Sequence, residues 1–372
     1  MPSQQTEPPD GRLTRLRGPQ PPQPYTARKI TALTANPACA RRAVLDAAGV
    51  DKARLAQQVG YEPRFGQSPF TLAREQAFHS LVKWGGYAEL IRLLREQLSV
   101  PVAEAHVTDL NEVGGNTSLP MRERETRRLI AHVASGQDVR LILDHPVLTL
   151  EVAGQTAYLE PDALTHRIDG KFHIVLIRSF PAIDGQANPT AVAEAAKQAA
   201  VYVLALRRTF DAAGLPTEQI SHRFLLVCPK DFSNRPYCRP IDLRQELDAL
   251  QFQLSRLRRA EDLAARLPET ATLDTTRSID ELSLSLEALD ASYTPSCLSF
   301  CEMARYCRDE ADRCASPARL GSGVRNDLPG IDSTRTALDY LDGVAAPGEA
   351  EVEAADRLGT AARLRRLRGG AA

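Results

Sequence analysis

The sequence predicts a mixed α/β fold from the order of its helical and strand-like segments. Helical periodicity is typical of much of the first 135 residues, and the apolar period changes to two between residues 139 and 180. A strong helical pattern follows at 189–210, and an apolar strand pattern at 223–229. Helices, an antiparallel meander, a further helix and a strand together predict a mixed sheet flanked by helices.

Composition sets the class of protein before any motif is considered. The chain has 372 residues, of which 43% are hydrophobic and 25% charged, as in ordinary globular proteins with one large or two medium domains. The 46 basic and 47 acidic residues leave a net charge of −1, which indicates no polyanionic partner by itself. No apolar run is long enough to span a membrane and no secretory signal is present, so we expect a cytoplasmic protein with no membrane partner.

The N-terminal part is expected to be a tail followed by helices. Residues 1–29 are rich in Pro and Gln and carry several Arg, which predicts a disordered basic tail. Asn36 and Pro37 are a typical start for a helix that places Cys39, Ala43, Val44 and Ala47 on one side. Further helices are predicted over 70–84, which ends at Gly85 and Gly86, and over 87–97.

Helices and strands are also predicted in the central and C-terminal parts of the chain. A charged helix is expected over 121–135, and three or four strands joined by hairpins over 139–180, with breaks at His145-Pro146, Gly154 and Asp169-Gly170. One long Arg-rich helix is predicted over 242–267. We expect one domain over residues 30–315 and a peripheral Ala/Arg-rich helical tail over 316–372.

Four of the seven cysteines lie within 18 residues of one another, in the order Cys297, Cys301, Cys307 and Cys314. Clustered thiolates in a reducing compartment are natural ligands for zinc or an iron–sulfur cluster, although this spacing differs from the paired C-x2-C of structural zinc sites. The alternative is a helix that uses Cys as a small apolar residue. Either Cys314 or the distant Cys39 can supply a fourth ligand, and Cys39 would tie the two ends of the domain together. Cys228, in a strand, and Cys238, in a Pro-rich loop, are expected to be unliganded.

A second set of polar residues follows the predicted sheet. Asp162 precedes the strand pattern that ends in IVLIRSF, and Gln198 and Tyr202 follow on the next helix. Residues four apart project from one face of a helix, so these two side chains are expected to act together.

With these residues in place, the chain resembles the RecB-like branch of the PD-(D/E)XK nuclease superfamily that carries a four-iron four-sulfur cluster, over about residues 30–315. CRISPR-associated RecB-type exonucleases and the nuclease domain of AddB are similar examples. The resemblance implies a restriction-endonuclease-like mixed sheet with a helical N-terminal part and a C-terminal iron–sulfur clasp. It implies DNA as a partner, together with a protein partner such as a helicase or nuclease subunit.

The resemblance also implies roles for individual residues. Asp162 and His79 would bind Mg²⁺ or Mn²⁺, Gln198 and Tyr202 would form the Q-x3-Y pair, and Leu176 and Arg178 stand where the family has an acidic residue and Lys. The cluster ligands would be Cys39, Cys297, Cys301 and Cys307, with Cys314 as the alternative to Cys297. The first C-terminal gap is three residues, where two is usual.

Leu176 and Arg178 differ from the acidic residue and the Lys of the family, and this difference changes the expected activity. Leu176 cannot ligate a divalent cation, and Arg178 is a permanent cation that cannot act as a base. Asp169 and Lys171 also form a D-x-K pattern, but Asp-Gly between alternating segments is typical of a hairpin turn. The sequence therefore predicts a catalytically degenerate protein that binds DNA or scaffolds a repair or phage-defence complex.

Two alternatives remain open on the sequence. An active metal-dependent exonuclease or endonuclease would recruit another carboxylate, such as Glu160, Asp184 or Glu194, in place of Leu176. A zinc-stabilised interaction module would use the cysteines alone. His145, His166 and His173 are expected to be ordinary sheet or core residues. The arginines at 256, 258, 259 and 266, and those within 363–368, are candidates for nucleic-acid contact.

Overall fold

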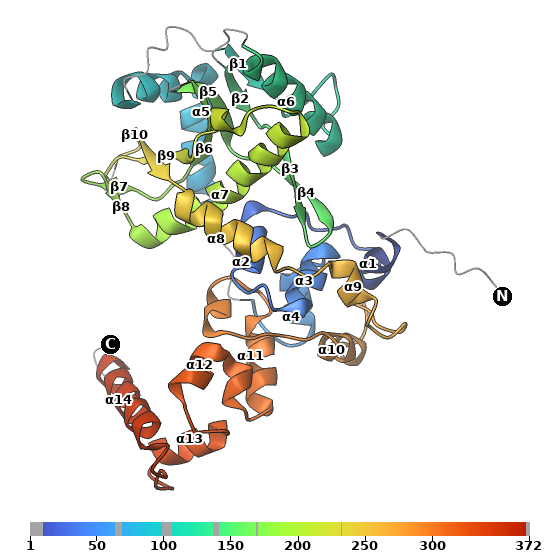
Figure 1. The fold of residues 1–372 in the computed structure, drawn as a ribbon, viewed down its shortest axis with the longest axis vertical. Helices are drawn as coiled ribbons and strands as arrows, with labels where there is room; N and C mark the ends of the chain where they lie inside the picture. Colours follow the sequence, from blue (N-terminus) through green and yellow to red (C-terminus); the bar gives the residue numbers. More distant parts are fainter. Residues whose placement is uncertain are drawn as a thin grey trace, which may run out of the picture. The chain divides into compact units, whose positions relative to one another are not determined.

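The structure is a computed structural model that describes residues 10–63, 69–98, 106–136, 141–168, 170–231 and 233–369. The chain divides into two compact units (Figure 1). The first unit is built from Met1–Pro22, Ala38–Gly66 and Glu261–Ala372, and the second from Gln23–Pro37 and Gln67–Ala260. None of the described helices is long and apolar enough to cross a membrane.

The second unit contains a six-stranded mixed sheet with the strand order β1-β2-β5-β6-β9-β10. Its strands are β1 (His106–Asp109), β2 (Leu141–Asp144), β5 (Ala163–Ile168), β6 (Lys171–Ile177), β9 (Arg223–Pro229) and β10 (Pro236–Asp242). The β1–β2 and β6–β9 pairs are parallel, and the other three pairs are antiparallel. The predicted mixed sheet flanked by helices is therefore confirmed.

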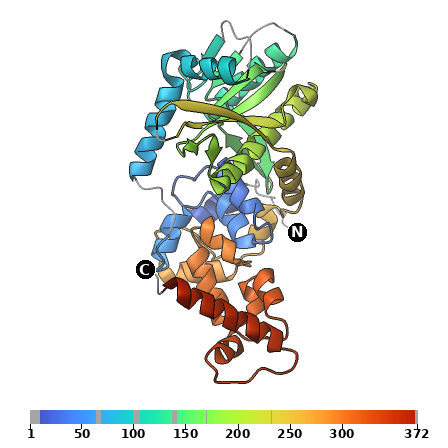
Figure 2. The ribbon, with the colours of Figure 1, turned by 90° about the vertical axis from the view of Figure 1, so that its left-hand side faces the viewer.

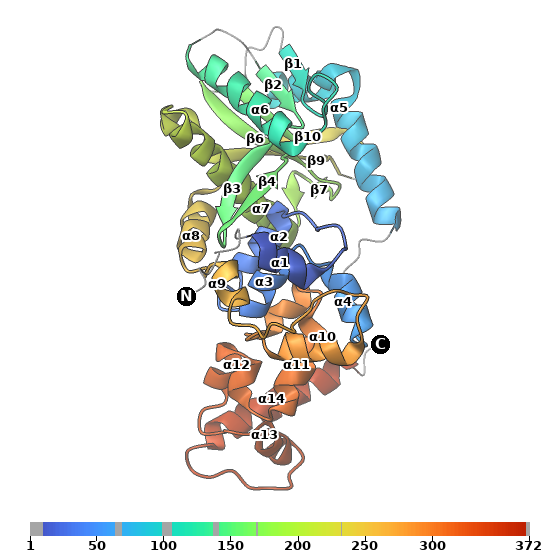
Figure 3. The same ribbon diagram turned by 90° about the vertical axis from the view of Figure 1, so that its right-hand side faces the viewer.

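Two small hairpins accompany this sheet (Figure 3). One pairs β3 (Leu148–Val152) with β4 (Gln155–Leu159), and the other pairs β7 (Ala182–Ile183) with β8 (Gln186–Ala187). The β3–β4 turn has positive φ at Ala153 (51°) and Gly154 (84°), as a two-residue hairpin loop requires. The break predicted at Gly154 is this turn.

The helices of the second unit are α2 (Ala27–Thr34), α5 (Pro69–Leu98), α6 (Leu119–Ala134), α7 (Pro189–Ala212) and α8 (Arg244–Ser255). Alternation along β6 sends Val175 and Ile177 to one face of the sheet, where they pack against residues of α5. Figure 2 shows the blue helix α5 running beside the sheet. Phe172 points to the other face and meets Phe210 of α7 edge to face at 5.3 Å. Because α7 connects β6 to the parallel strand β9, it is the crossover helix of this sheet.

Helix α5 is interrupted at the predicted position. Trp84 is extended, and Gly85, Gly86 and Tyr87 have φ between 63° and 69°. Glycine adopts this left-handed conformation without strain, which explains the two glycines, whereas Tyr87 is an uncommon occupant. The expected helices before and after Gly85-Gly86 are therefore the two halves of α5.

Three expectations about elements were wrong, and strand β1 was missed. Cys238 lies in β10 rather than in a loop. The predicted helix over 242–267 is two helices, α8 and α9 (Ala260–Ala264), because the chain leaves the helix after Ser255 and the Ala260 N–H donates to the Ala153 carbonyl. Residues 10–17 were expected to be disordered but form a helix. The turn predicted at Asp169-Gly170 involves a residue outside the described part of the chain.

The first unit is helical in its described residues. Its helices are α1 (Asp10–Arg17), α3 (Ala40–Ala47), α4 (Lys52–Gln58), α10 (Ile279–Glu287), α11 (Ala304–Arg313), α12 (Ser322–Asp327), α13 (Thr334–Leu341) and α14 (Val352–Gly369). Helix α1 buries Leu13 and Leu16, three residues apart on one face, and Arg12 donates to the Ala264 carbonyl. This packing holds the helix of residues 10–17 within the first unit. The last three helices share a small apolar cluster, which contains Leu328, Ile331, Ala337 and Ala354.

Gly18, directly after α1, is a position where only glycine fits. Its φ is +74°, and a Cβ atom would lie 2.6 Å from the Asp274 Cγ atom. We expect Gly18→Ala to lower the free energy of unfolding by about 2 kcal/mol, measured by chemical denaturation, because backbone strain and the clash add. Gly60→Ala is the matched control, since Gly60 has φ +88° and nothing within 4 Å of the added Cβ. Equal losses in the two variants would contradict the role of the close approach.

Candidate functional site

Asp162 lies directly before β5 and connects this strand to the end of β6. Its Oδ2 atom accepts hydrogen bonds from the Ile177 backbone N–H at 2.7 Å and from Arg178 Nη1 at 2.9 Å. The Asp162 carboxylate is thus neutralised by the guanidinium that follows β6, and it is held at a defined place on the sheet.

Two further predicted residues converge on the same place from the helices. His79 of α5 has its Nε2 atom 2.8 Å from the Ile177 carbonyl and its Nδ1 atom 3.9 Å from Asp162 Oδ1. Gln198 of α7 accepts a hydrogen bond from Arg178 Nη2 at 3.2 Å. The structure therefore brings together His79, Asp162, Arg178 and Gln198, which are far apart in the sequence.

Tyr202 belongs to the same electrostatic environment. Burial raises the pKa of Tyr202, the Asp162 carboxylate raises it further, and the Arg178 guanidinium opposes this effect. Its phenol therefore stays protonated at neutral pH and can donate a hydrogen bond.

The position expected for the second carboxylate is apolar. Leu176 is 1% exposed, pairs with Leu226 of β9, and lies on the same face of β6 as Arg178 because side chains alternate along a strand. A divalent cation held by Asp162 would meet a hydrocarbon side chain on this strand and the cation Arg178 beside it. The residues at 162, 176 and 178 therefore do not fit Mg²⁺ or Mn²⁺.

The three carboxylates expected as substitutes for Leu176 each have another environment. Glu160 bonds to Arg122 at 2.8 Å and to His145 Nδ1 at 2.6 Å. Burial disfavours its charge, but the hydrogen bonds from His145 and Arg122 prevail and lower the pKa of Glu160. Asp184 lies in the β7–β8 turn, where its N–H donates to Asp231, and Glu194 is exposed on α7.

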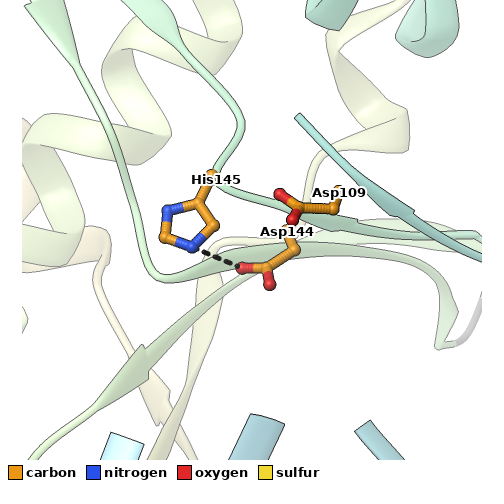
Figure 4. Close-up of side chains that lie close together, drawn as sticks. All are labelled: Asp109, Asp144 and His145. Carbon is orange, nitrogen blue, oxygen red and sulfur yellow. Dashed lines mark ion pairs between the residues drawn. The ribbon is translucent and has the colours of Figure 1, made fainter. Parts of the chain in front are cut away.

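A group that the sequence did not predict lies at the ends of β1 and β2. Asp109 and Asp144 are register partners in this parallel pair, and His145 follows Asp144 directly. One ligand atom from each lies within 4.8 Å of the others. Figure 4 shows the three side chains close together at the strand ends. His145 was expected to be an ordinary sheet or core residue, and it lies directly after β2, outside the strand. The signal that could have found the group is an Asp at the end of two short strand patterns, HVTD and LILD.

The cysteines expected to bind a cluster are all buried in the first unit. Cys39 precedes α3, Cys297 and Cys301 lie before α11, and Cys307 lies within α11, whereas Cys314 is exposed. Besides burial, the negative charges of the Cys301 and Cys39 thiolates raise the pKa of Cys307. Those of Cys297 and Cys307 likewise raise the pKa of Tyr293. The fold thus brings Cys39 to the C-terminal cysteines. Cys228 and Cys238 are buried on adjacent strands of the sheet in the second unit.

Two buried arginines accompany these cysteines. Arg41 is 2% exposed, and its Nη1 atom donates to Cys307 Sγ at 3.1 Å and to Glu310 at 2.7 Å. Arg42 pairs with Asp46 and donates to the Phe300 carbonyl. A guanidinium that donates to sulfur stabilises the thiolate, which is the form that binds metal.

Burial has the opposite effect on the free thiols. It raises the pKa of Cys301 to about 11 and that of Cys307 to about 12, although nearby Arg41 and Arg42 lower these values in part. Without a metal these sulfurs are therefore neutral thiols at pH 7. The buried cysteines could hold a metal, and their soft donor set fits zinc or an iron–sulfur cluster.

Comparisons with known proteins give little further information. No family model and no curated protein matches the chain. A candidate exonuclease from Eubacterium rectale is similar in structure, with 13% identity, a TM-score of 0.28, and 70% of this chain and 86% of that chain covered. The protein SSO0001 is similar with 15% identity, a TM-score of 0.18, and 45% and 83% covered. TM-scores of this size do not establish a common fold.

Proposed function

We propose that this chain is a nuclease-fold protein of the RecB-like PD-(D/E)XK type that binds DNA and has lost its own catalytic centre. The observation that carries the proposal is the pair between Arg178 and Asp162, with Leu176 buried beside it. The Arg178 guanidinium pairs with the Asp162 carboxylate, which would otherwise hold the metal. The neighbouring position on β6 is occupied by Leu176, which cannot ionise.

The order of elements supports the same proposal. Asp162 directly precedes β5, Leu176 lies near the end of the antiparallel neighbour β6 and Arg178 directly follows it, and Gln198 and Tyr202 lie on the crossover helix α7. This is the order in which the family places its acidic residue, its D/E-x-K pair and its Q-x3-Y helix. With the metal ligands missing, these polar groups are suited to holding the ends of the central strands β5 and β6 in place rather than to activating water.

The cysteines carry the second part of the proposal, a four-iron four-sulfur cluster on Cys39, Cys297, Cys301 and Cys307. When bound, the cluster supplies a rigid link between four thiolates. Arg41 donates an N–H to the Cys307 sulfur, which favours the thiolate form and fixes its direction. Zinc on the same thiolates is the competing assignment, and it would accompany an interaction module without a role on DNA.

Exposed arginines support DNA as the partner. Helix α14 exposes Arg363, Arg365 and Arg366 within four residues, and Arg256 and Arg258 are exposed after α8. Guanidinium groups on an exposed helix suit bidentate contacts to phosphates. A separate protein, such as a helicase or nuclease subunit, would then supply cleavage in a repair or phage-defence complex.

DNA binding should depend steeply on salt. We expect the affinity for a fluorescent duplex to fall as KCl rises, with a slope of about −0.9 per neutralised phosphate. Replacing Arg363, Arg365 and Arg366 together with Gln should reduce the magnitude of the slope by about 2 to 3, as measured by fluorescence anisotropy. Arg335→Gln is the control, because this exposed arginine already pairs with Asp339. No measurable binding at low salt would remove DNA from the proposal.

The loss of catalysis is tested on anaerobically purified protein. Single- and double-stranded DNA with Mg²⁺ or Mn²⁺ should be cleaved no faster by the native chain than by Asp162→Ala. Cleavage that Asp162→Ala abolishes would instead establish a metal-dependent nuclease in which another carboxylate replaces Leu176. DNA binding without cleavage is the expected result.

A further inference from the structure

The group at the ends of β1 and β2 has the arrangement of a metal site, separate from the residues discussed around Asp162. In a parallel pair, register partners lie side by side, and here both strands end in Asp. The Asp109 and Asp144 carboxylates and the His145 ring therefore converge without any long loop (Figure 4). Asp144 is buried and Asp109 is exposed, which leaves a path for an ion to enter.

The protonation of His145 follows from its neighbours. Its Nδ1 atom lies 2.6 Å from Glu160 Oε1, and Glu160 is fixed in turn by Arg122. Its Nε2 atom lies 3.3 Å from Lys83 Nζ, which can only donate. Hence Nδ1 carries the proton and Nε2 carries the lone pair. A histidine that ligates a metal through one nitrogen usually donates the other N–H to a carboxylate in this way.

A cation already lies at this place. The Lys83 ammonium is 2.7 Å from Asp144 Oδ1 and 3.3 Å from His145 Nε2. The Asp109 carboxylate accepts a hydrogen bond from the Asn111 N–H, and its position opposite Asp144 adds a second negative charge. Asp109, Asp144 and Glu160 thus bring three carboxylates, against Lys83 and Arg122 as cations. A divalent ion in place of the ammonium would neutralise this excess.

Tyr87 lies beside the same group. Its side chain is 2% exposed, and its hydroxyl approaches the Asp144 carboxylate without a hydrogen bond of normal geometry within the described part of the chain. A water bound to an ion beside Asp144 would complete the partners of this buried hydroxyl.

We propose that Asp109, Asp144 and His145 Nε2 bind one divalent first-row metal ion, of the Mn²⁺ or Zn²⁺ class, and that binding displaces the Lys83 ammonium. Two carboxylates and one imidazole match the ligand preference of these ions better than that of Mg²⁺, which binds oxygen. This site does not depend on the proposed loss of catalysis around Asp162.

The test uses Mn²⁺, because thiolates prefer softer metals and the cysteines would confuse a zinc titration. The full-length protein with its native cysteines is titrated with Mn²⁺, and the loss of the free-ion signal is followed by electron paramagnetic resonance. One ion should bind per chain. Asp109→Asn and His145→Asn should each weaken binding by at least about tenfold. Asparagine suits the His145 position because it tolerates the φ of 54° there.

Variants at Lys83 and at two other carboxylates distinguish binding at this site from binding elsewhere on the chain. Lys83→Met should tighten Mn²⁺ binding by roughly tenfold or more, because a competing positive charge is removed. Asp162→Asn and the exposed Asp211→Asn should leave the affinity unchanged. Binding that is lost in Asp162→Asn but kept in Asp109→Asn would overturn the assignment. No binding of Mn²⁺, or weaker binding in Lys83→Met with unchanged melting, would overturn it as well.

Discussion

Cys301→Ser should remove the bound metal and unfold the first unit. Metal binding to buried thiolates contributes folding free energy, on the order of 10 kcal/mol for structural sites, because the site does not exist in the unfolded chain. Cys301 is buried, so water has little access to the place of its thiolate. We therefore expect a fall in melting temperature of more than about 10 °C, since a loss of 1 kcal/mol alone shifts melting by several degrees. Cys39→Ser should behave in the same way.

The measurement combines melting by circular dichroism with iron, sulfide and zinc content after anaerobic purification. Cys314→Ser and Cys228→Ser are matched controls, because Cys314 is exposed and Cys228 is buried in β9 of the second unit. Both should keep their metal. Unchanged melting and unchanged iron in Cys301→Ser would end the proposal of a clasp, and zinc without sulfide would favour the interaction module.

Asp46→Asn should cost about 3 to 5 kcal/mol of unfolding free energy, since it leaves two buried cations without their shared carboxylate. Asp46 is buried, with Arg42 Nε 3.1 Å from one carboxylate oxygen and the Lys52 ammonium in contact with the other. Neither cation has free access to water. The loss is far larger than for an exposed pair, which contributes about 0 to 1 kcal/mol.

Urea denaturation followed by near-ultraviolet circular dichroism measures this loss. Glu353→Gln, which removes an exposed pair with Arg357 on α14 in the same unit, is the control and should change stability by less than about 0.5 kcal/mol. A loss in Asp46→Asn below about 1 kcal/mol would show that other groups neutralise Arg42 and Lys52.

Elements with a full period of apolar residues could be predicted from the sequence. Helix α7, strand β9 and the break in α5 occur where the pattern places them. Strands β1 and β10 could not be predicted, because both lie at the edges of the sheet. β1 has four residues, and β10 carries Pro236 and Pro240, which an edge strand tolerates and a central strand does not.

The candidate sites also contain one part that the sequence predicts and one part that depends on the tertiary fold. The sequence order identified Asp162, Arg178 and Gln198, and the contacts among them are consistent with that order. The Asp at the end of each short strand pattern is visible in the sequence, but the convergence of Asp109 with Asp144 follows only once these strands, 32 or more residues apart, are known to pair in parallel. The contacts of Lys83 with Asp144 and His145 likewise require the tertiary fold, since a lysine on a helix carries no such signal.

The interleaving of the two units sets the order in which a ribosome can complete them. The second unit ends at Ala260, so all of its strands emerge before Cys297 has been made. Cys39 precedes Cys301 by 262 positions, and at roughly 5 to 20 residues per second that separation takes about 13 to 50 seconds. During this interval Arg41 and Arg42 have neither their C-terminal partners nor burial. The first unit therefore stays incomplete until translation has passed Cys307, and a cluster on Cys39, Cys297, Cys301 and Cys307 can be inserted only after that point.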